Sequence, residues 1–232
     1  MTTQLKLPIA LRDSASFANF FVGDNDELWA SLAHLGGPGA NGNLFVHGPP
    51  GAGKTHLLQA LSRQAIEAGG DALYVPLSQS GVAPALVSEL SDASLVCIDD
   101  AHQIAGLPDW EEALLELYER LLGGTGALVV AADLPPRQLG FYLADLSSRL
   151  GASSVYALKG LTEQQLPAAM RLRAKTRGLA LPDNTIEYLL RRFRRDSTSV
   201  FSILDQVDEA AWQHQRRLTV PFVKEIEKDL GR

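Results

Sequence analysis

Gly48-Pro49-Pro50-Gly51-Ala52-Gly53-Lys54-Thr55 fits the pattern G-x-x-x-x-G-K-[ST] without a mismatch. A short apolar run, Leu44-Phe45-Val46, comes just before it. Apolar residues at helical spacing follow it, from Leu57 to Ala65. This order of strand, loop and helix predicts a phosphate-binding loop, and it argues against a glycine-rich turn with an unrelated lysine.

Each part of this loop has a physical role. The glycines let backbone N–H groups close around phosphate oxygens, which a Cβ atom would obstruct. The helix that begins near Lys54 directs its positive end at the same anion. We expect Lys54 to reach the β- and γ-phosphates of a nucleotide, and the Thr55 hydroxyl to bind Mg²⁺.

Composition describes an ordinary globular protein, with 46% hydrophobic and 21% charged residues. No apolar run approaches the roughly 20 residues that span a bilayer, and the first residues lack the apolar core of a signal peptide. The single cysteine, Cys97, lies in an apolar run and is expected to be a small buried hydrophobe. These features predict a cytoplasmic protein with no membrane partner.

The net charge of −6 is unevenly distributed. Residues 1–159 carry 8 Lys and Arg against 17 Asp and Glu, a net charge of −9. Residues 160–232 carry 13 against 10, a net charge of +3. This asymmetry suggests two units, and the overall acidity argues against a general nucleic-acid coat protein.

A second apolar run, Leu95-Val96-Cys97-Ile98, ends in the carboxylates of Asp99 and Asp100. Such runs are typical of strands buried on both faces of a parallel sheet, whose ligands bind at the carboxyl ends of the strands. We expect Asp99 to bind Mg²⁺ and Asp100 to orient or deprotonate a water molecule. A strand-end turn with solvated aspartates is the alternative.

Further strands are expected at 72–77, at 127–132 (ending at Asp133) and at 154–158, with helices at 27–35, 84–90, 108–122 and 145–150 between them. The pattern predicts an α/β fold, a phosphate-loop module with a parallel five-stranded sheet between helices. Upstream of the loop, Phe17, Phe20 and Val22 are expected to wall an adenine pocket. Core packing is an equally good interpretation of each of these three residues.

From residue 160 onward the strand patterns vanish, and helices are expected at about 162–177, 183–193, 197–214 and from 219. This is a small all-α domain. The expected domains are a tail at 1–12, a nucleotide-binding α/β domain at 13–159 and a helical domain at 160–232. The basic run Arg191-Arg192-Phe193-Arg194-Arg195 is either a solvated helix end or a contact for phosphates or a partner.

The tail contains Gln4-Leu5-Lys6-Leu7-Pro8-Ile9, a short apolar segment in which proline favours an extended chain. Extended apolar peptides of this kind dock into grooves on partner proteins. Physical reasoning alone leaves open whether the segment binds a partner or folds back on its own domain.

The constellation resembles the AAA+ ATPases, and within them the DnaA branch of bacterial replication initiators. The phosphate loop, the paired aspartates, Asp133, a late arginine and the helical lid make up this likeness. Three stretches are similar to DnaA in particular: Ser16-Phe17-Ala18-Asn19-Phe20 with Gly23, Lys54-Thr55-His56-Leu57-Leu58, and Ala132-Asp133-Leu134-Pro135-Pro136.

Nothing after the lid supplies the helix-turn-helix domain with which DnaA initiators read duplex DNA. What remains resembles the Hda family of DnaA-related regulators. The likeness rests on Asp205-Gln206-Val207-Asp208, on the segment from Leu218 to Ile226, and on the tail. Gln4, Leu5, Leu7, Pro8 and Ile9 are similar to the motif by which that family binds the DNA polymerase III sliding clamp, its beta subunit.

The resemblance implies a negative regulator of replication initiation, which docks on the DNA-loaded clamp and promotes hydrolysis of ATP bound to DnaA. Arg149 would be an arginine finger offered in trans, and Asp100 and Asp133 would be catalytic. DNA would be reached mainly through the clamp, and self-association is open. DNA contact by the basic run is also open.

One position departs from the family. AAA+ lids usually carry a sensor arginine where this chain has Thr198, and only the nearby Arg194 or Arg195 could replace it. If neither does, sensing of the γ-phosphate is weakened, and the bound cofactor, ADP or ATP with Mg²⁺, would serve structure more than turnover. Two other functions stay open: an autonomous AAA+ ATPase in DNA remodelling or helicase loading, and a paralogue that tethers DnaA without stimulating hydrolysis.

Overall fold

The computed structural model describes residues 15–79, 81–88, 90, 93–124, 126–194 and 196–229. Contacts divide the chain into two compact units. The first holds the α/β part up to Leu158, and the second holds the C-terminal helices from Lys159 together with the short segment Ala18–Asp24. In this segment, Gly23 lies against the side chain of Gln165, which belongs to the same unit. The domain limits expected from sequence did not anticipate this exchange.

A parallel sheet of five strands forms the centre of the first unit. Its strands stand in the spatial order β2-β3-β4-β1-β5. Their bounds are Gly42–His47 (β1), Ala72–Pro76 (β2), Leu95–Asp99 (β3), Ala127–Ala132 (β4) and Ser154–Ala157 (β5). Every residue of β3 and β4 is buried, as expected for inner strands of a parallel sheet covered on both faces.

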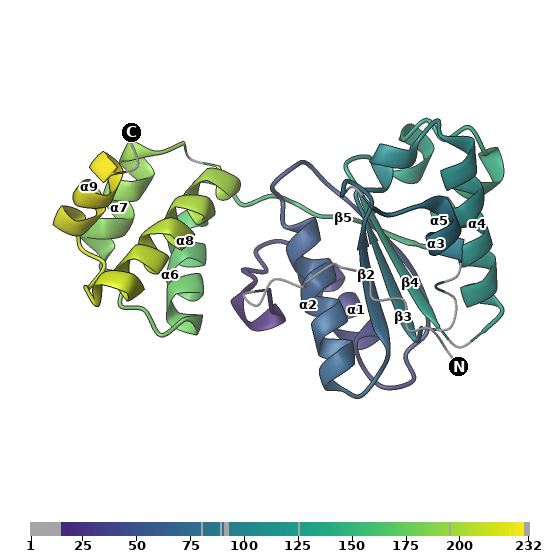
Figure 1. Cartoon of the computed structure of the whole chain (residues 1–232), viewed down its shortest axis with the longest axis horizontal. Helices are drawn as coiled ribbons and strands as arrows, with labels where there is room; N and C mark the ends of the chain where they lie inside the picture. Colours follow the sequence, from purple (N-terminus) through teal and green to yellow (C-terminus); the bar gives the residue numbers. More distant parts are fainter. Residues whose placement is uncertain are drawn as a thin grey trace. The chain divides into compact units, whose positions relative to one another are not determined.

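Helices cover both faces of this sheet (Figure 1). On one face lie α1 (Asp26–Leu35) and α2 (Lys54–Glu67), and on the other lie α3 (Pro84–Ser88), α4 (Pro108–Leu122) and α5 (Ala144–Ala152). Leu114, Leu117, Leu146 and Leu150 join α4 and α5 to the sheet in one apolar core. Cys97 is fully buried, and burial raises the pKa of its thiol to about 12, so it packs as a hydrophobe.

The strand order brings the loop after β1 beside the end of β4. The chain leaves β1 through α2 for the edge strand β2, and then returns through β3 and β4 until β4 pairs with β1. His47 is in register with Ala132. The residues that follow, Gly48 and Asp133, therefore lie at the same edge of the sheet, where ligands of such folds bind.

The second unit is a helical lid built from α6 (Leu166–Thr176), α7 (Asp183–Arg192), α8 (Ser197–His214) and α9 (Val220–Asp229). An apolar core that includes Met170, Ile186, Ile203 and Phe222 lies between these helices. The expected five-stranded α/β module with an all-α lid is thus confirmed. Among the described residues, no helix is long and apolar enough to cross a membrane.

The start of the first lid helix differs from the expected start at residue 162. The carbonyl of Thr162 accepts bonds from the N–H groups of Gln165 and Leu166, and the α-helix begins at Leu166. Pro167 stands in the first turn of this helix, where its missing N–H needs no partner. The proline therefore marks the helix start and leaves it regular.

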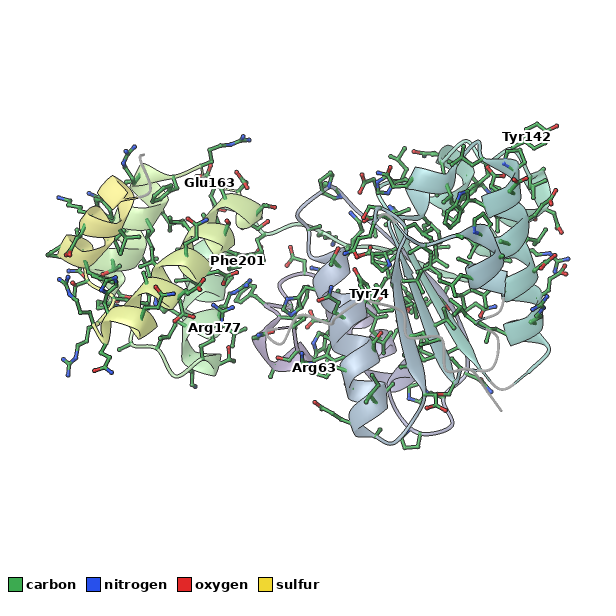
Figure 2. All side chains as sticks on the ribbon, in the orientation of Figure 1. Arg63, Tyr74, Tyr142, Glu163, Arg177 and Phe201 are labelled. Atoms are coloured by element: carbon green, nitrogen blue, oxygen red, sulfur yellow. The ribbon has the colours of Figure 1, made fainter. Side chains whose placement is uncertain are left out.

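Two half-buried arginines tie α6 to α8. Arg173 lies 2.8 Å from Asp205, and its guanidinium stacks over the Phe201 ring at 4.9 Å. Arg177 contacts Asp205 at 2.8 Å and Asp208 at 2.9 Å. Figure 2 shows Arg177 and Phe201 within the lid. Part of the lid's positive charge is therefore used in holding its own helices together.

Asp196 caps the N-terminus of α8. Its carboxylate accepts hydrogen bonds from the Ser199 backbone N–H at 2.8 Å and from the Ser199 hydroxyl at 2.9 Å. The backbone bond is the main cause that lowers the pKa of Asp196. The residue thus satisfies one of the free donors in the first turn of the helix.

Replacing the cap should weaken the lid in a pH-dependent way. Asp196→Ala should lower the free energy of unfolding by about 1 kcal/mol near pH 7. The folded-state pKa of Asp196 is lowered, so its stabilisation exists above the ordinary Asp pKa and is lost as pH falls through the lowered value. Urea unfolding at about pH 7 and about pH 3 measures this difference. Asp196→Asn keeps a cap and is the control, and an equal loss at both pH values would contradict the assignment.

Candidate nucleotide-binding site

The loop from Gly48 to Thr55 joins β1 to α2, as its flanks predicted. Gly51 and Gly53 adopt φ angles of 79° and 109°, which other residues rarely reach. At Gly48 glycine is required by lack of space, because a Cβ atom there would overlap the carbonyl oxygen of Leu158. Pro49 accepts a bond from the Ala52 N–H, which closes a turn around Pro50.

Lys54 is the first residue of α2, and its side chain is only 6% exposed. Its ammonium donates to the carbonyl oxygens of Gly48 at 2.7 Å and Pro49 at 3.2 Å. It also donates to Oδ1 of Asp133 at 2.8 Å. The cation is therefore held inside the loop by the chain itself, next to the start of a helix, where an anion is favoured.

Asp133 contacts His102 as well as Lys54. Its Oδ2 lies 3.5 Å from Nε2 of His102, in the short 3-10 helix that follows β3. The Nδ1 atom of His102 is buried and has no hydrogen-bond partner among the described residues. His102 was not among the site residues expected from sequence, although its place three residues after Asp99 puts it at the same sheet edge.

Asp99 is fully buried at the end of β3. Its carboxylate accepts hydrogen bonds from the Tyr74 hydroxyl at 2.8 Å, from the Asp100 N–H at 3.0 Å, and from the Thr55 hydroxyl. Burial raises the pKa of Asp99, and these bonds oppose that rise. Tyr74, labelled in Figure 2, was also missed by sequence reasoning; burial is the main cause that raises its pKa.

Thr55 and Asp99 are thus brought together as expected for residues that hold Mg²⁺. A hydroxyl and one carboxylate suit this ion, which keeps several waters and takes further ligands from phosphates. Within the part of the chain that the structure describes, no cluster of three or more His, Cys, Asp or Glu side chains could bind a metal alone. The donor set therefore fits a metal that arrives with a nucleotide, where it would neutralise phosphate charge.

Asp100 adopts a left-handed conformation, with a φ angle of 59°. Its Oδ2 accepts a hydrogen bond from the Ser78 hydroxyl at 2.6 Å. Ser78 follows β2, and β2 lies on the side of β3 away from β4 and β1. In this structure the Asp100 carboxylate is therefore bonded on the side away from the phosphate loop.

Arg149 lies on α5, and its guanidinium bonds to two carboxylates. Its Nε donates to Asp145 at 2.9 Å, and its Nη2 lies 2.9 Å from Glu119 of α4. The side chain is 35% exposed. These partners hold the guanidinium at the surface of the unit. Asp145 belongs to α5 and Glu119 to α4, and neither belongs to the phosphate loop.

The three residues expected around adenine fall into different units. Phe17 belongs to the first unit and packs edge-to-face against Trp29, at 5.9 Å between ring centroids. Phe20 and Val22 belong to the second unit. The segment from Gln4 to Ile9, which was expected to bind the clamp, lies outside the described residues.

In the lid, Thr198 is an exposed residue of the first turn of α8. Three arginines of the basic run have carboxylate neighbours: Arg191 with Glu187, Arg192 with Glu227 and Arg194 with Asp196. The Arg194–Asp196 distance is 3.3 Å, and Arg195 lies outside the described residues. These pairs favour the interpretation of the run as a solvated helix end.

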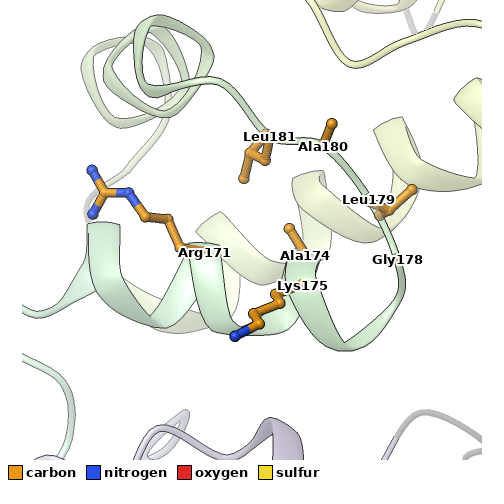
Figure 3. Close-up of a pocket in the computed structure, with 7 residues that line it drawn as sticks. All are labelled: Arg171, Ala174, Lys175, Gly178, Leu179, Ala180 and Leu181. Atoms are coloured by element: carbon orange, nitrogen blue, oxygen red, sulfur yellow. The ribbon is translucent and has the colours of Figure 1, made fainter.

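A shallow pocket of about 390 Å³ opens in the lid between α6 and the segment that leads to α7 (Figure 3). Ala174, Leu179 and Leu181 line it, with Arg171 and Lys175 at its border. Arg171 is paired with Asp183 at 2.8 Å. None of the predicted site residues lines this pocket, so we place the candidate site at the phosphate loop.

The chain is similar to two known families over neighbouring stretches. Residues 11–157 match the bacterial DnaA ATPase domain. Residues 163–226 match the lid domain of Hda. The two matches cover the two parts of the chain in which the sequence analysis placed the nucleotide-binding domain and the lid.

Solved structures show the same fold. Domain III of the replication initiation protein DnaA from Thermotoga maritima superposes with a TM-score of 0.77 at 19% identity, over 95% of this chain and 98% of that chain. AMPPCP-bound DnaA from Aquifex aeolicus gives a TM-score of 0.71 at 21% identity, over 86% and 67%. A RuvB variant from Thermotoga maritima gives 0.65 at 19% identity, over 93% and 72%.

Removing the loop cation should weaken binding of a phosphate ligand. Lys54→Ala is expected to lower the affinity for ADP and ATP by about 10- to 100-fold, because one charge-assisted bond to phosphate is lost. Titration with a fluorescent adenine nucleotide in the presence of Mg²⁺ measures this. Lys175→Ala removes an exposed lysine of the lid pocket and should bind as the wild type does. Unchanged affinity in Lys54→Ala would refute the site.

Proposed function

The chain belongs to the family of bacterial DnaA ATPase domains, and from that premise we propose that it is a negative regulator of DnaA in the initiation of chromosome replication. The match of its lid to Hda supports a DnaA-related regulator over an unrelated AAA+ machine. The function proposed is to stimulate hydrolysis of the ATP that DnaA holds.

Its own phosphate loop binds ADP or ATP. Support comes from the buried Lys54, the three glycines whose conformation or space admits no larger residue, and the Thr55–Asp99 pair that suits Mg²⁺. The related DnaA structure from Aquifex aeolicus carries AMPPCP. When bound, Mg²⁺ would neutralise the charge of the phosphates that Lys54 and the loop N–H groups hold.

The proposal rests mainly on the exposure of Arg149 and on its hydrogen-bond partners. Its guanidinium is partly exposed and is bonded to carboxylates of α4 and α5, away from the chain's own phosphate loop. An arginine held in this way can be offered to a nucleotide on another molecule. We therefore assign Arg149 as an arginine finger that acts in trans on ATP bound to DnaA.

Charge and shape explain why arginine suits this role. In phosphoryl transfer, negative charge spreads over the equatorial oxygens of the γ-phosphate, and catalysis depends on positioned opposite charge. The planar guanidinium can donate two parallel bonds to such oxygens. A lysine would supply the charge without the fork, so Arg149→Lys should not restore the function.

Turnover of the chain's own nucleotide would be weak. The Asp100 carboxylate, expected to orient a water molecule, is bonded to Ser78 beyond β2. Thr198 stands where the lid sensor arginine is usual, and Arg194 is paired with Asp196. These features support a nucleotide bound as a structural element, with Asp133 in contact with Lys54 as the residue that senses its phosphates.

The tail completes the proposal. Gln4, Leu5, Leu7, Pro8 and Ile9 would bind the beta subunit of the sliding clamp on DNA, and the clamp would bring the regulator to DnaA. DNA contact would then come mainly through the clamp. The support for this step is the sequence motif, since the tail lies outside the described residues.

The test is ATP hydrolysis by purified DnaA, with and without this chain and the DNA-loaded clamp. Stimulation should require the clamp and should be lost in Gln4→Ala/Leu5→Ala. Arg149→Ala should reduce stimulated hydrolysis by on the order of 10³-fold, the usual contribution of such a finger. Hydrolysis is followed as release of labelled phosphate from DnaA loaded with labelled ATP.

Arg120→Ala is the matched control, because it removes another surface arginine, one that pairs with Glu116 on α4. It should stimulate as the wild type does. No stimulation by the wild type under any condition would sink the proposal. In that case a role in tethering DnaA without stimulating hydrolysis would remain. Stimulation that survives in Arg149→Ala would refute the assignment of Arg149 as the finger, and rapid hydrolysis without DnaA would indicate an autonomous ATPase.

A further inference from the structure

Glu111 is a carboxylate with no exposed surface, in the first turn of α4. Its Oε1 accepts hydrogen bonds from the backbone N–H groups of Gly106 at 2.7 Å and Tyr142 at 3.0 Å. Its Oε2 accepts one from the N–H of Leu143 at 2.7 Å. Neither the phosphate loop nor the lid provides these partners, so the functions assigned so far do not explain this residue.

Burying a carboxylate is costly unless its oxygens are well hydrogen-bonded, and here backbone N–H groups supply the bonds. Two of them come from the residues just before α5, which begins at Ala144. Leu143, the N-cap of α5, has no side chain that can cap the helix. Glu111 therefore supplies from α4 a buried anion at the positive end of α5, in addition to the exposed Asp145 in the first turn of that helix.

The helix held in this way carries the proposed arginine finger. Leu146 and Leu150 face the apolar core from α5, so the helix cannot turn about its axis without losing this packing. Arg149 follows the cap by six residues, about 9 Å along the helix axis. A shift at the N-terminus of α5 would therefore change where its guanidinium lies.

A second contact between the same helices lies at the finger itself. Glu119 of α4 is 2.9 Å from Arg149. Glu119 lies eight residues after Glu111 on α4. Glu111 contacts the backbone at the start of α5, and Glu119 contacts Arg149 further along the same helix. The buried contact at Glu111 is shielded from water and salt, whereas Glu119 is half exposed.

We propose that Glu111 is a positioning residue, which sets the place of Arg149 by anchoring the start of α5 to α4. This inference rests on the function proposed for Arg149. Tyr142 lies at the same junction. Its N–H donates to Glu111, whereas the residue is 75% exposed and its side chain projects from the unit (Figure 2). The backbone there is fixed although the side chain is free.

The test is the stimulation of DnaA-bound ATP hydrolysis by Glu111→Gln. The amide keeps the shape of the side chain but places an NH₂ group where one accepting oxygen was. We expect the rate at saturating regulator to fall by about tenfold, since small displacements of a catalytic group are costly. The regulator concentration that gives half of the maximal rate, and the affinity of the regulator for ADP, should stay unchanged.

Glu112→Gln is the matched control, because the neighbouring residue of α4 is exposed and loses the same charge. The double variant Glu111→Gln/Arg149→Ala should be no slower than Arg149→Ala alone, since Glu111 acts through Arg149. A further loss in the double variant, or a change confined to the half-saturating concentration, would overturn the inference.

Two more outcomes separate this inference from the proposed function. If Arg149→Ala stimulates like the wild type, the proposed function fails. If Arg149→Ala is defective while Glu111→Gln keeps the wild-type rate, only the positioning role fails. Glu111→Asp keeps the charge on a shorter chain and should fall between wild type and Glu111→Gln; loss of ADP binding in both variants would assign Glu111 to folding and overturn the inference.

Discussion

The parallel pairing of β1 with β4 is the constraint on which the candidate site depends. It places His47 opposite Ala132, and the Gly48 N–H donates to the Ala132 carbonyl at 3.3 Å just beyond the strands. The next residue of the β4 segment, Asp133, then lies within bonding distance of Lys54. A lysine and an aspartate that are 79 residues apart in the sequence become an ion pair because two strands are neighbours.

Two buried carboxylates of the first unit are satisfied in different ways. Asp99 is bonded by one backbone N–H, that of Asp100, and by the hydroxyls of Tyr74 and Thr55, groups that can exchange partners when a metal and phosphates arrive. Glu111 is bonded by three backbone N–H groups, whose positions are set by the chain. The first arrangement suits a ligand site, and the second suits a fixed joint between helices.

The positive charge of the lid is used mainly within the lid. Arg173 and Arg177 bind carboxylates of α8, and the exposed Arg191 pairs with Glu187 one turn away on α7. The uneven distribution of charge along the sequence suggested two units, and the contacts divide the chain into two. Carboxylates lie beside each of these three arginines, so their charge is partly neutralised within the lid.

Much of the fold and part of the site follow from sequence, because local patterns encode them. The loop from Gly48 to Thr55, the buried run that ends at Asp99 and the helical spacing of the lid depend on near neighbours in the chain. Tertiary structure alone decided the rest: that Asp133 lies between Lys54 and His102, that Asp100 turns to Ser78, and that Glu111 holds the backbone just before α5. These contacts join residues from different strands and helices, and only the strand order and the packing of α4 on α5 bring them within bonding distance.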